Sequence, residues 1–258
     1  MDKIINLHPE HGESTPHGIA VLATDPPADS LIPMHTHRRG QLLYATSGVM
    51  IVRADAGSWV VPPGRAVWIA PGVAHEIELA GTVAMRTVFV EPDLCVGLGE
   101  VGRVLHVSAL LQHLILSGAA VPLDHAKGGR DERLMALILD EMHAAPTLAL
   151  HVPMPRHPGL ARLCQRFIAD PSLAVTLDAW ADVLHMNART LARLFRRETG
   201  MTFGNWRRQT RLLLSLPHLA AGASILEVAL AHGYDSPSAF TAMFRRALGV
   251  APSSYISQ

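Results

Sequence analysis

The chain has 258 residues, enough for two domains, and 49% of them are hydrophobic. This composition predicts a packed core and excludes a disordered chain, and no apolar run approaches the ~18 residues of a membrane span. Residues 156–258 contain 12 Arg, no Lys and 6 acidic residues, whereas residues 1–155 contain 10 basic and 16 acidic residues. A basic half joined to an acidic half favours a polyanion as the partner of the basic part.

The cysteines and the amino-terminus indicate the compartment. Cys95 and Cys164 are far apart in the sequence and do not form the spacing pattern of a disulfide framework. The first residues lack the long apolar core of a signal peptide. We therefore expect a cytoplasmic protein that does not interact with a membrane.

Residues 18–92 have the pattern of β-structure. Short apolar runs with Val, Ile, Tyr and Trp are interrupted by Gly, Pro and Asp about every eight to twelve residues. This rhythm predicts a small all-β sandwich or barrel. The strands we expect are Gln41–Thr46, Val49–Arg53, Ser58–Val61, Ala66–Ile69, His75–Leu79 and Met85–Val90.

From about residue 95 the apolar pattern becomes helical. One helical stripe extends from Val107 to Ile115 through Leu110, Leu111 and Leu114, and a second helix is expected over Asp131–His143. Four prolines between residues 146 and 158 predict an extended linker, since proline interrupts helices. All of the chain after Pro158 has a helical pattern with short turns.

The carboxy-terminal half contains an internal repeat. Leu191–Gly200 (LARLFRRETG) matches Phe240–Gly249 (FTAMFRRALG) at an offset of 49 residues, and a short amphipathic helix precedes each copy. Asn187 and Ser236 begin the two copies, and both are favoured N-cap residues. Two helices with a tight turn, the second helix rich in Arg, predict a helix-turn-helix. The sequence thus predicts two such units, at about residues 176–199 and 224–248.

The second helix of each unit is the expected DNA-reading element. Arg189, Arg193 and Arg196 lie opposite the apolar face in the first unit, where Arg can contact guanine or phosphate. An isolated Arg stripe is more often a solvated face, but the repeat, the caps and the clean segregation favour DNA binding. The first unit should carry most direct readout, and the second should contact phosphate, methyl groups or water-bridged edges. The predicted DNA-binding residues are Asn187, Ala188, Arg189, Ala192, Arg193, Arg196, Ser236, Pro237, Ser238, Ala242 and Arg245.

Residues 158–258, including the tail motif GYDSPSAFTAMFRRALGVAPSSY, resemble the DNA-binding domain of the AraC/XylS family of transcription regulators. The resemblance implies seven helices, with a long one over about Thr202–Leu219 joining the two units and setting their recognition helices ~34 Å apart. Pro217 departs from this pattern and should bend or shorten that helix. The implied partners are double-stranded promoter DNA, RNA polymerase if the protein activates, and a second copy of the chain.

The amino-terminal half resembles the cupin-like sensor domain found ahead of this DNA-binding domain. The resemblance implies a sensor barrel over residues 1–93 that binds a small effector, followed by a helical dimerisation or linker region over residues 94–157. By this analogy the Val107–Ile115 stripe is a candidate dimer face. Packing of the stripe against its own barrel is an equally good interpretation.

A candidate metal site follows from the same resemblance. His35, His37, Gln41 and His75 occupy the positions of the cupin ligands, and two His at i and i+2 on a strand point the same way. The set could bind one divalent ion such as Zn, Ni, Fe or Mn. Gln41 stands where the pattern has Glu, and a neutral carbonyl is a poorer ligand for a dication, which argues against a redox-active iron site.

Two alternatives to a metal remain. One is an organic effector pocket, to which Trp59, Trp68 and Arg86 are expected to contribute. The other is a purely structural barrel. For the whole chain, a DNA-binding regulator explains the repeat, the charge division and the caps, so we expect no catalytic residues. A metal-dependent cupin enzyme with an accessory helical domain explains only the histidine pattern.

Overall fold

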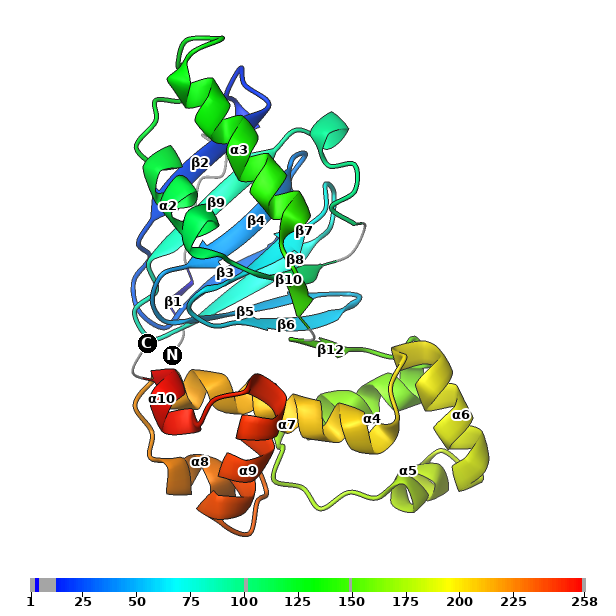
Figure 1. The fold of residues 1–258 in the computed structure, drawn as a ribbon. Helices are drawn as coiled ribbons and strands as arrows, with labels where there is room; N and C mark the ends of the chain where they lie inside the picture. Colours follow the sequence, from blue (N-terminus) through cyan, green and yellow to red (C-terminus); the bar gives the residue numbers. More distant parts are fainter. Residues whose placement is uncertain (1–2, 5–12, 100–101, 149, 257–258) are drawn as a thin grey trace. The chain divides into compact units, whose positions relative to one another are not determined.

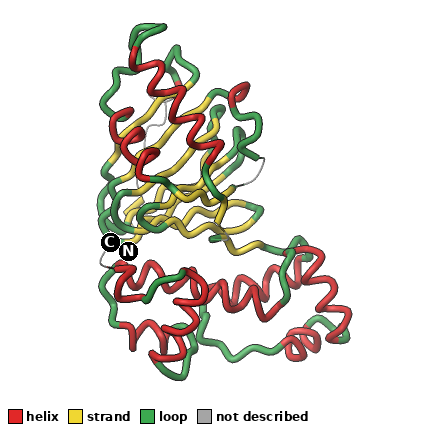
Figure 2. The backbone as a smooth tube through the Cα atoms, in the orientation of Figure 1, coloured by secondary structure: helices red, strands yellow, loops and turns green. Residues whose placement is uncertain are grey.

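The computed structural model describes residues 3–4, 13–99, 102–148 and 150–256 (Figures 1 and 2). The chain divides into two compact units, one formed by residues up to 150 without 56–58, and the other by 56–58 and the residues from 151 onward. The middle region that was expected over residues 94–157 is therefore not a separate part. Its helices belong to the first unit, because they bury their apolar stripes on that unit's own sheet.

Two sheets form the first unit. With one exception, the strand pairs whose register is defined are antiparallel; β1 pairs with β3 in parallel. The expected strands agree with the observed ones to within one residue at each end. One sheet has, in order, β1 (Lys3–Ile4), β3 (Ser30–His35), β8 (His75–Ala80), β5 (Val49–Ala54) and β6 (Gly57–Val61). The other has, in order, β11 (Thr147–Leu148), β10 (Arg103–His106), β7 (Arg65–Ile69), β4 (Gly40–Ala45), β9 (Met85–Val90) and β2 (Ile19–Thr24).

The second sheet has two buried faces. A short 3₁₀ turn (Pro92–Leu94) follows β9, and α2 (Ala109–Gly118) and α3 (Arg130–Ala144) then cover the outer face of this sheet (Figure 1). Because side chains alternate along a strand, Leu42 and Trp68 face these helices, while Gln41 and Leu43 line a cavity on the other face. The near-continuous burial of β4 follows from this two-sided cover.

The apolar stripe after the barrel packs mainly within its own unit. Helix α2 begins at Ala109 with Ser108 as its N-cap, so Val107 lies before the helix. Leu111 and Ile115 are buried against the sheet, whereas 51% of Leu110 is exposed. The buried positions of the stripe therefore pack on their own unit, as the second of the two interpretations predicted.

The second unit contains β12 (His151–Pro153) and, among the described residues after Pro158, the seven expected helices. The helices of both predicted units are capped as expected, by the side chains of Thr176, Asn187, Ser224 and Ser236. The two recognition helices each end at a glycine with positive φ, Gly200 and Gly249, which is the common helix C-cap. The helices are α4 (Pro158–Ala169), α5 (Leu177–Val183), α6 (Ala188–Thr199), α7 (Phe203–Ala220), α8 (Ile225–Ala231), α9 (Pro237–Leu248) and α10 (Pro252–Ile256).

An aromatic cluster holds the first helix-turn-helix to α7. Trp206 is fully buried, and its ring lies 5.7 Å from Phe167 and Phe195 and 6.3 Å from Trp180, between ring centroids. Its indole N–H donates to the carbonyl of Pro153, at 2.9 Å. Buried aromatic rings contribute large apolar areas and directional edge contacts, so this cluster gives the unit a rigid centre.

The proline inside α7 does not shorten the helix. Pro217 is buried, and the helix continues for three residues beyond it, to Ala220. Proline removes one i to i−4 hydrogen bond. Only three residues of the helix follow Pro217, so this loss lies near the helix end, which packs into the core through Leu216 and Leu219. No helix in the described part of the chain is long and apolar enough to cross a membrane.

We predict that the buried His232 makes the second unit lose stability below pH 6.5. Burial lowers its pKa from 6.5, and His218 and Arg211 lower it further. The unfolded chain therefore takes up this proton at a higher pH than the folded chain, so stability is complete above pH 6.5 and is lost as the pH falls. Urea unfolding followed by far-UV circular dichroism should show a larger loss of unfolding free energy between pH 6.5 and 5.5 in wild type than in His232→Asn.

The two proteins share every other histidine, so the difference between them reports on position 232. His113→Asn, on the exposed surface of α2, is the matched control and should behave like wild type. Equal pH dependence of wild type and His232→Asn would contradict the prediction.

Candidate DNA interface and three-histidine site

The first recognition helix, α6, separates apolar and basic side chains completely. Leu191 and Phe195 are fully buried, while Arg189, Arg193 and Arg196 are exposed on the opposite face. The turn before α6 passes through His185, whose φ is +53°, and Asn187 then accepts a hydrogen bond from the Thr190 N–H at 2.8 Å. The three guanidinium groups are thus free to extend outward from a rigid helix, as the sequence predicted.

The second recognition helix, α9, has the same geometry with a different surface. Phe240 and Phe244 are buried, and Ser238, Ala242 and Arg245 are exposed. A capping box at Ser224 and Glu227 begins α8, and Gly233 at φ +68° forms the turn between the two helices. The outward face of α9 therefore carries one cation where that of α6 carries three.

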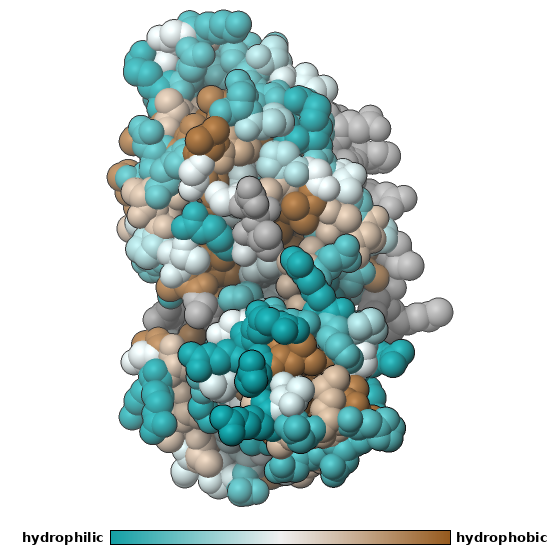
Figure 3. Space-filling model, turned by 90° about the vertical axis from the view of Figure 1, so that its right-hand side faces the viewer, coloured by the Kyte–Doolittle hydropathy of each residue, from teal (hydrophilic) through white to brown (hydrophobic). Residues whose placement is uncertain are grey.

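The remaining predicted DNA contacts lie at the starts of these helices. Asn187 and Ser236 use their side-chain oxygens as helix caps, and Pro237 occupies the first turn of α9. Ala188 and Ala192 are half-buried on α6. Hydrophilic side chains predominate on the side of the helical unit seen in Figure 3, which is the side of α5 and α6 in Figure 1.

Sequence reasoning missed several arginines beside these faces. Arg197 and Arg246 immediately follow Arg196 and Arg245 in the two repeat copies, so the FRR motif itself could have indicated them. Arg197 lines an open depression on α6. Arg246 and Arg208 line a groove between α7 and α9.

Not every arginine of this unit points outward. The Arg211 guanidinium donates to the carbonyls of Pro171, Gly233 and Leu173, at 2.9, 3.1 and 3.3 Å. It also lies 5.7 Å from the centre of the Tyr234 ring. Arg211 therefore holds the turn of the second helix-turn-helix. Its guanidinium is engaged within the unit, unlike the exposed guanidinium groups of α6.

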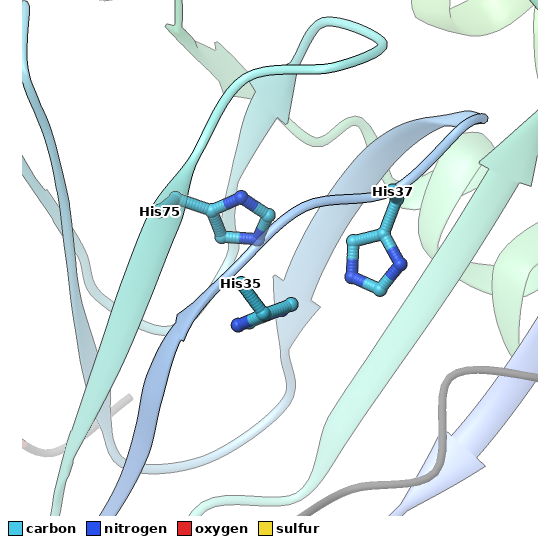
Figure 4. A group of neighbouring side chains, drawn as sticks. All are labelled: His35, His37 and His75. Carbon is cyan, nitrogen blue, oxygen red and sulfur yellow. The ribbon is translucent and has the colours of Figure 1, made fainter.

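The three histidines of the candidate metal site meet in the first unit (Figure 4). The His35 ring centroid lies 4.4 Å from that of His75 and 4.8 Å from that of His37, and one ligand nitrogen from each ring lies within 4.8 Å of the others. His35 is the last residue of β3 and His75 the first of β8. The rings converge at the end of this strand pair.

One feature of the prediction for this site was wrong. His35 and His37 do not both lie on a strand, because β3 ends at His35 and its pairing with β8 is irregular between Ile32 and His35. Pro33 has no backbone N–H for the sheet, which accounts for part of this irregularity. The chain bends after His35, and this bend brings the His37 ring to the cluster from the side (Figure 4).

Hydrogen bonds set the orientation of the rings. Nδ1 of His35 lies 2.7 Å from the carbonyl of Pro33, and Nδ1 of His75 lies 2.9 Å from that of Val73. A carbonyl only accepts, so each Nδ1 carries the proton and each Nε2 keeps its lone pair. Nδ1 of His37 has no hydrogen bond among the described residues and lies 3.5 Å from Oε1 of Glu13, and its other ring nitrogen is on the side of the two other rings (Figure 4).

The surroundings keep His37 and His75 neutral and leave polar atoms unpaired. Burial, and the neighbouring His35 ring after it, lowers the pKa of His37 to about 4, and burial lowers the pKa of His75 to about 4. Nε2 of His75 and Oε1 of Gln41 are buried without a hydrogen-bond partner among the described residues. Neutral imidazoles and a free amide oxygen are donors that a divalent cation can use.

The cavity beside the cluster is small, about 50 Å³, and lies between the two sheets. None of the three residues predicted for an organic effector lines it. Trp68 faces the helices α2 and α3, and its indole N–H donates to the carbonyl of Gly99. Trp59 is buried on β6. Arg86 forms an ion pair with Asp25 at 3.0 Å. The cavity is lined by Leu22, Thr24, Ile32, His35, His37, Gln41, Leu43, Ile77, Met85, Thr87 and Phe89.

Known proteins resemble both halves of the chain. The family model of the AraC-like ligand binding domain matches residues 16–169, and that of a helix-turn-helix domain matches residues 180–258. The HTH-type transcriptional regulator NimR of Escherichia coli is 34% identical over 226 residues, which are 88% of this chain and 82% of NimR. The HTH-type transcriptional regulator RipA of Corynebacterium glutamicum is 32% identical over 103 residues, which are 40% of this chain and 31% of RipA.

Among solved structures, ToxT from Vibrio cholerae matches 93% of this chain and 98% of its own, with 9% identity and a TM-score of 0.40, too low to add to the argument. The family models and NimR carry the assignment, since they cover both units and extend over most of the chain. The chain belongs to the AraC family of helix-turn-helix transcriptional regulators.

Proposed function

We propose that this regulator reads promoter DNA chiefly through α6, while α9 mainly holds the DNA backbone. The observation that carries this proposal is the difference between the two exposed faces, with Arg189, Arg193 and Arg196 on α6 against Ser238, Ala242 and Arg245 on α9. An arginine can bond both acceptors of a guanine edge at once. An alanine can only contact a thymine methyl group, and a lone arginine at the end of a helix suits a phosphate.

The relatives are regulators, which favours this function over the alternative of a metal-dependent cupin enzyme. The first unit then acts as the sensor that modulates DNA binding. Its cavity of about 50 Å³ suits a metal ion or a ligand of a few atoms, since pockets for drug-sized molecules have volumes of roughly 300–1,000 Å³.

We predict that Arg193→Ala raises the dissociation constant for the operator by about 5- to 150-fold, equivalent to about 1–3 kcal/mol, and relaxes specificity at one base pair. Arg245→Ala should weaken binding evenly across all sequences, because a phosphate contact carries no base information. Fluorescence anisotropy on a duplex selected from a random pool, and on its single-base-pair variants, measures both effects. Equivalent specificity profiles for the two variants would contradict the division between α6 and α9.

We also predict a steep salt dependence of DNA binding. Each phosphate contact releases about one counterion, so Arg245→Ala should reduce the slope of log K against log salt by about 1. The same titration on wild type provides the reference slope. A salt-insensitive interaction would rule out the DNA-binding function that we propose for these arginines.

We further propose that the three-histidine site holds one divalent metal ion, with Zn or Ni fitting the donors best. His35, His37 and His75 would hold it through Nε2, and Gln41 could add its amide oxygen. Tetrahedral zinc at 2.0–2.1 Å requires ligand nitrogens ~3.3 Å apart, so the rings would close from 4.8 Å. When bound, the metal would supply a Lewis acid beside the small cavity.

Glu13 would act as the positioning residue of this site. Its carboxylate faces Nδ1 of His37 and accepts from the Arg39 backbone N–H at 3.2 Å, so it is held in place. A carboxylate on the outer nitrogen of a metal-bound histidine sets the tautomer and raises the basicity of the ligand. Glu13 thus places a carboxylate beside a site whose own ligands, three histidines and one glutamine, carry no carboxylate.

We predict that wild-type protein purified without a histidine tag contains about one metal per chain by mass spectrometry, and that His75→Ala loses it. Glu13→Gln should retain the fold but bind zinc about 10- to 100-fold more weakly in competition with a chromophoric chelator. The matched control is Glu76→Gln, next to His75 but bonded to Arg53. Metal-free wild type, or equal zinc affinity in Glu13→Gln and wild type, would refute the proposal.

A further inference from the structure

A groove between α7 and α9 forms an apolar recess in the described part of the helical unit, with a volume of about 420 Å³. Its volume is about eight times that of the cavity beside the histidines and falls in the range of ligand pockets, roughly 300–1,000 Å³. An organic molecule therefore fits this groove and not the sandwich cavity. The groove is lined by Met201, Asn205, Arg208, Gln209, Leu212, Tyr234, Ala239, Ala242, Met243, Arg246 and Ala247.

The floor of the groove is apolar and its edges are basic. Met201, Leu212 and Met243 form the apolar part, and methionine sulfurs make favourable contacts with aromatic rings. Arg208 and Arg246 are exposed and line the groove from α7 and α9, and none of the described lining residues is acidic. An apolar floor between two cations matches a flat apolar body that carries a negative charge.

Tyr234, in the turn before α9, is also one of the residues that line this groove. The Tyr234 hydroxyl is buried and has no hydrogen-bond partner among the described residues. The Tyr234 ring is fixed by Phe240, 5.4 Å away between centroids, and by the Arg211 guanidinium. The ring of Tyr234 is therefore a fixed part of the groove lining, and its hydroxyl is closed off from solvent.

The internal repeat shows why the groove exists on α9 and not on α6. Ala242 and Met243 correspond to Arg193 and Leu194 at the 49-residue offset. The depression on α6 is lined by three arginines. Its lining includes no residue from a second helix that faces α6. On α9 the alanines leave space that the side chains of α7 border, so the same helix face becomes the wall of an apolar groove.

We propose that the groove between α7 and α9 binds an amphipathic organic anion, an aromatic carboxylate of one or two fused rings, and that the bound anion competes with DNA. The rings lie on the methionine and leucine floor, and the carboxylate bonds to Arg208 and Arg246. A bare DNA phosphate would gain little from that floor, because it has no apolar surface to bury. The competition, unlike the binding itself, rests on the proposed DNA contact of Ala242.

The test uses 2-naphthoate as the probe and the full chain without DNA. Isothermal titration should give a dissociation constant tighter than ~1 mM, the value expected for an efficient ligand of this size. Arg208→Gln and Arg246→Gln should each weaken binding about tenfold, because each removes a charge-assisted hydrogen bond. Arg197→Gln, the repeat equivalent of Arg246, is the matched control and should bind like wild type, and the neutral 2-naphthamide should bind at least tenfold more weakly.

Methionine methyl NMR then locates the probe. The methyl signals of Met201 and Met243, assigned through Met201→Leu and Met243→Leu, should shift on addition of 2-naphthoate, while that of the exposed Met34 in the first unit should not. Adding the operator duplex should reverse the shifts. No binding, equal binding of the amide, or equal loss in Arg197→Gln would overturn the site while leaving the proposed DNA-binding function untouched.

Two further results would also be decisive. If Arg208→Gln and Arg246→Gln weakened DNA binding but not 2-naphthoate binding, the groove would be a seat for DNA phosphates and the proposal would be wrong. If 2-naphthoate stayed bound beside DNA, the competition would be refuted.

Discussion

Burial of equivalent apolar side chains against α7 and its neighbours determines which side chains of the two recognition helices remain outside. Phe195 and Phe244 occupy the same repeat position, and both are completely buried. Rotating α6 by one residue would turn it by 100° and bring an arginine toward the aromatic core around Trp206. Burying an unpaired charge is costly, so the outward direction of Arg189, Arg193 and Arg196 follows from the packing of the inner face.

The β-sandwich obeys a different constraint. Most side chains that line the cavity between its sheets are apolar, yet His35, His37 and Gln41 also line it, and His75 lies beside the two histidines. Carbonyls of Pro33 and Val73 hold two of the rings in one tautomer, and burial keeps His37 and His75 uncharged. These conditions favour cation binding through nitrogen lone pairs, and the narrow space beside the rings restricts what else can enter.

The two units therefore offer recesses of different chemistry. The cavity of the sandwich is small and surrounded by neutral donors, whereas the groove of the helical unit is larger, apolar and edged by guanidinium groups. The alanines of α9 create this second recess, and they also account for the smaller charge of its exposed face. One difference between the repeat copies thus affects both DNA contact and the space available to a ligand.

Sequence patterns predicted the elements well, because periodicity and capping are local properties. The alternating burial of β8 and the N-caps at Asn187 and Ser236 need only neighbouring residues to be understood. The prediction that His35 and His37 share a strand was wrong, since the irregular pairing of β3 with β8 lies outside the local sequence. Trp68, which was expected beside an effector, does not line the cavity. It points to the helices α2 and α3, because the sheet that contains β7 is buried on both faces.

The sequence by itself determined the two-unit organisation, the paired helix-turn-helix and the basic face of α6, since each depends on spacing along the chain. Only the tertiary structure decided which distant groups meet. Glu13 reaches His37 across 24 positions of sequence, and Arg208 shares a groove with Arg246 on another helix. Such contacts depend on how strands and helices pack in three dimensions. The residue pattern around each member of the pair does not predict them.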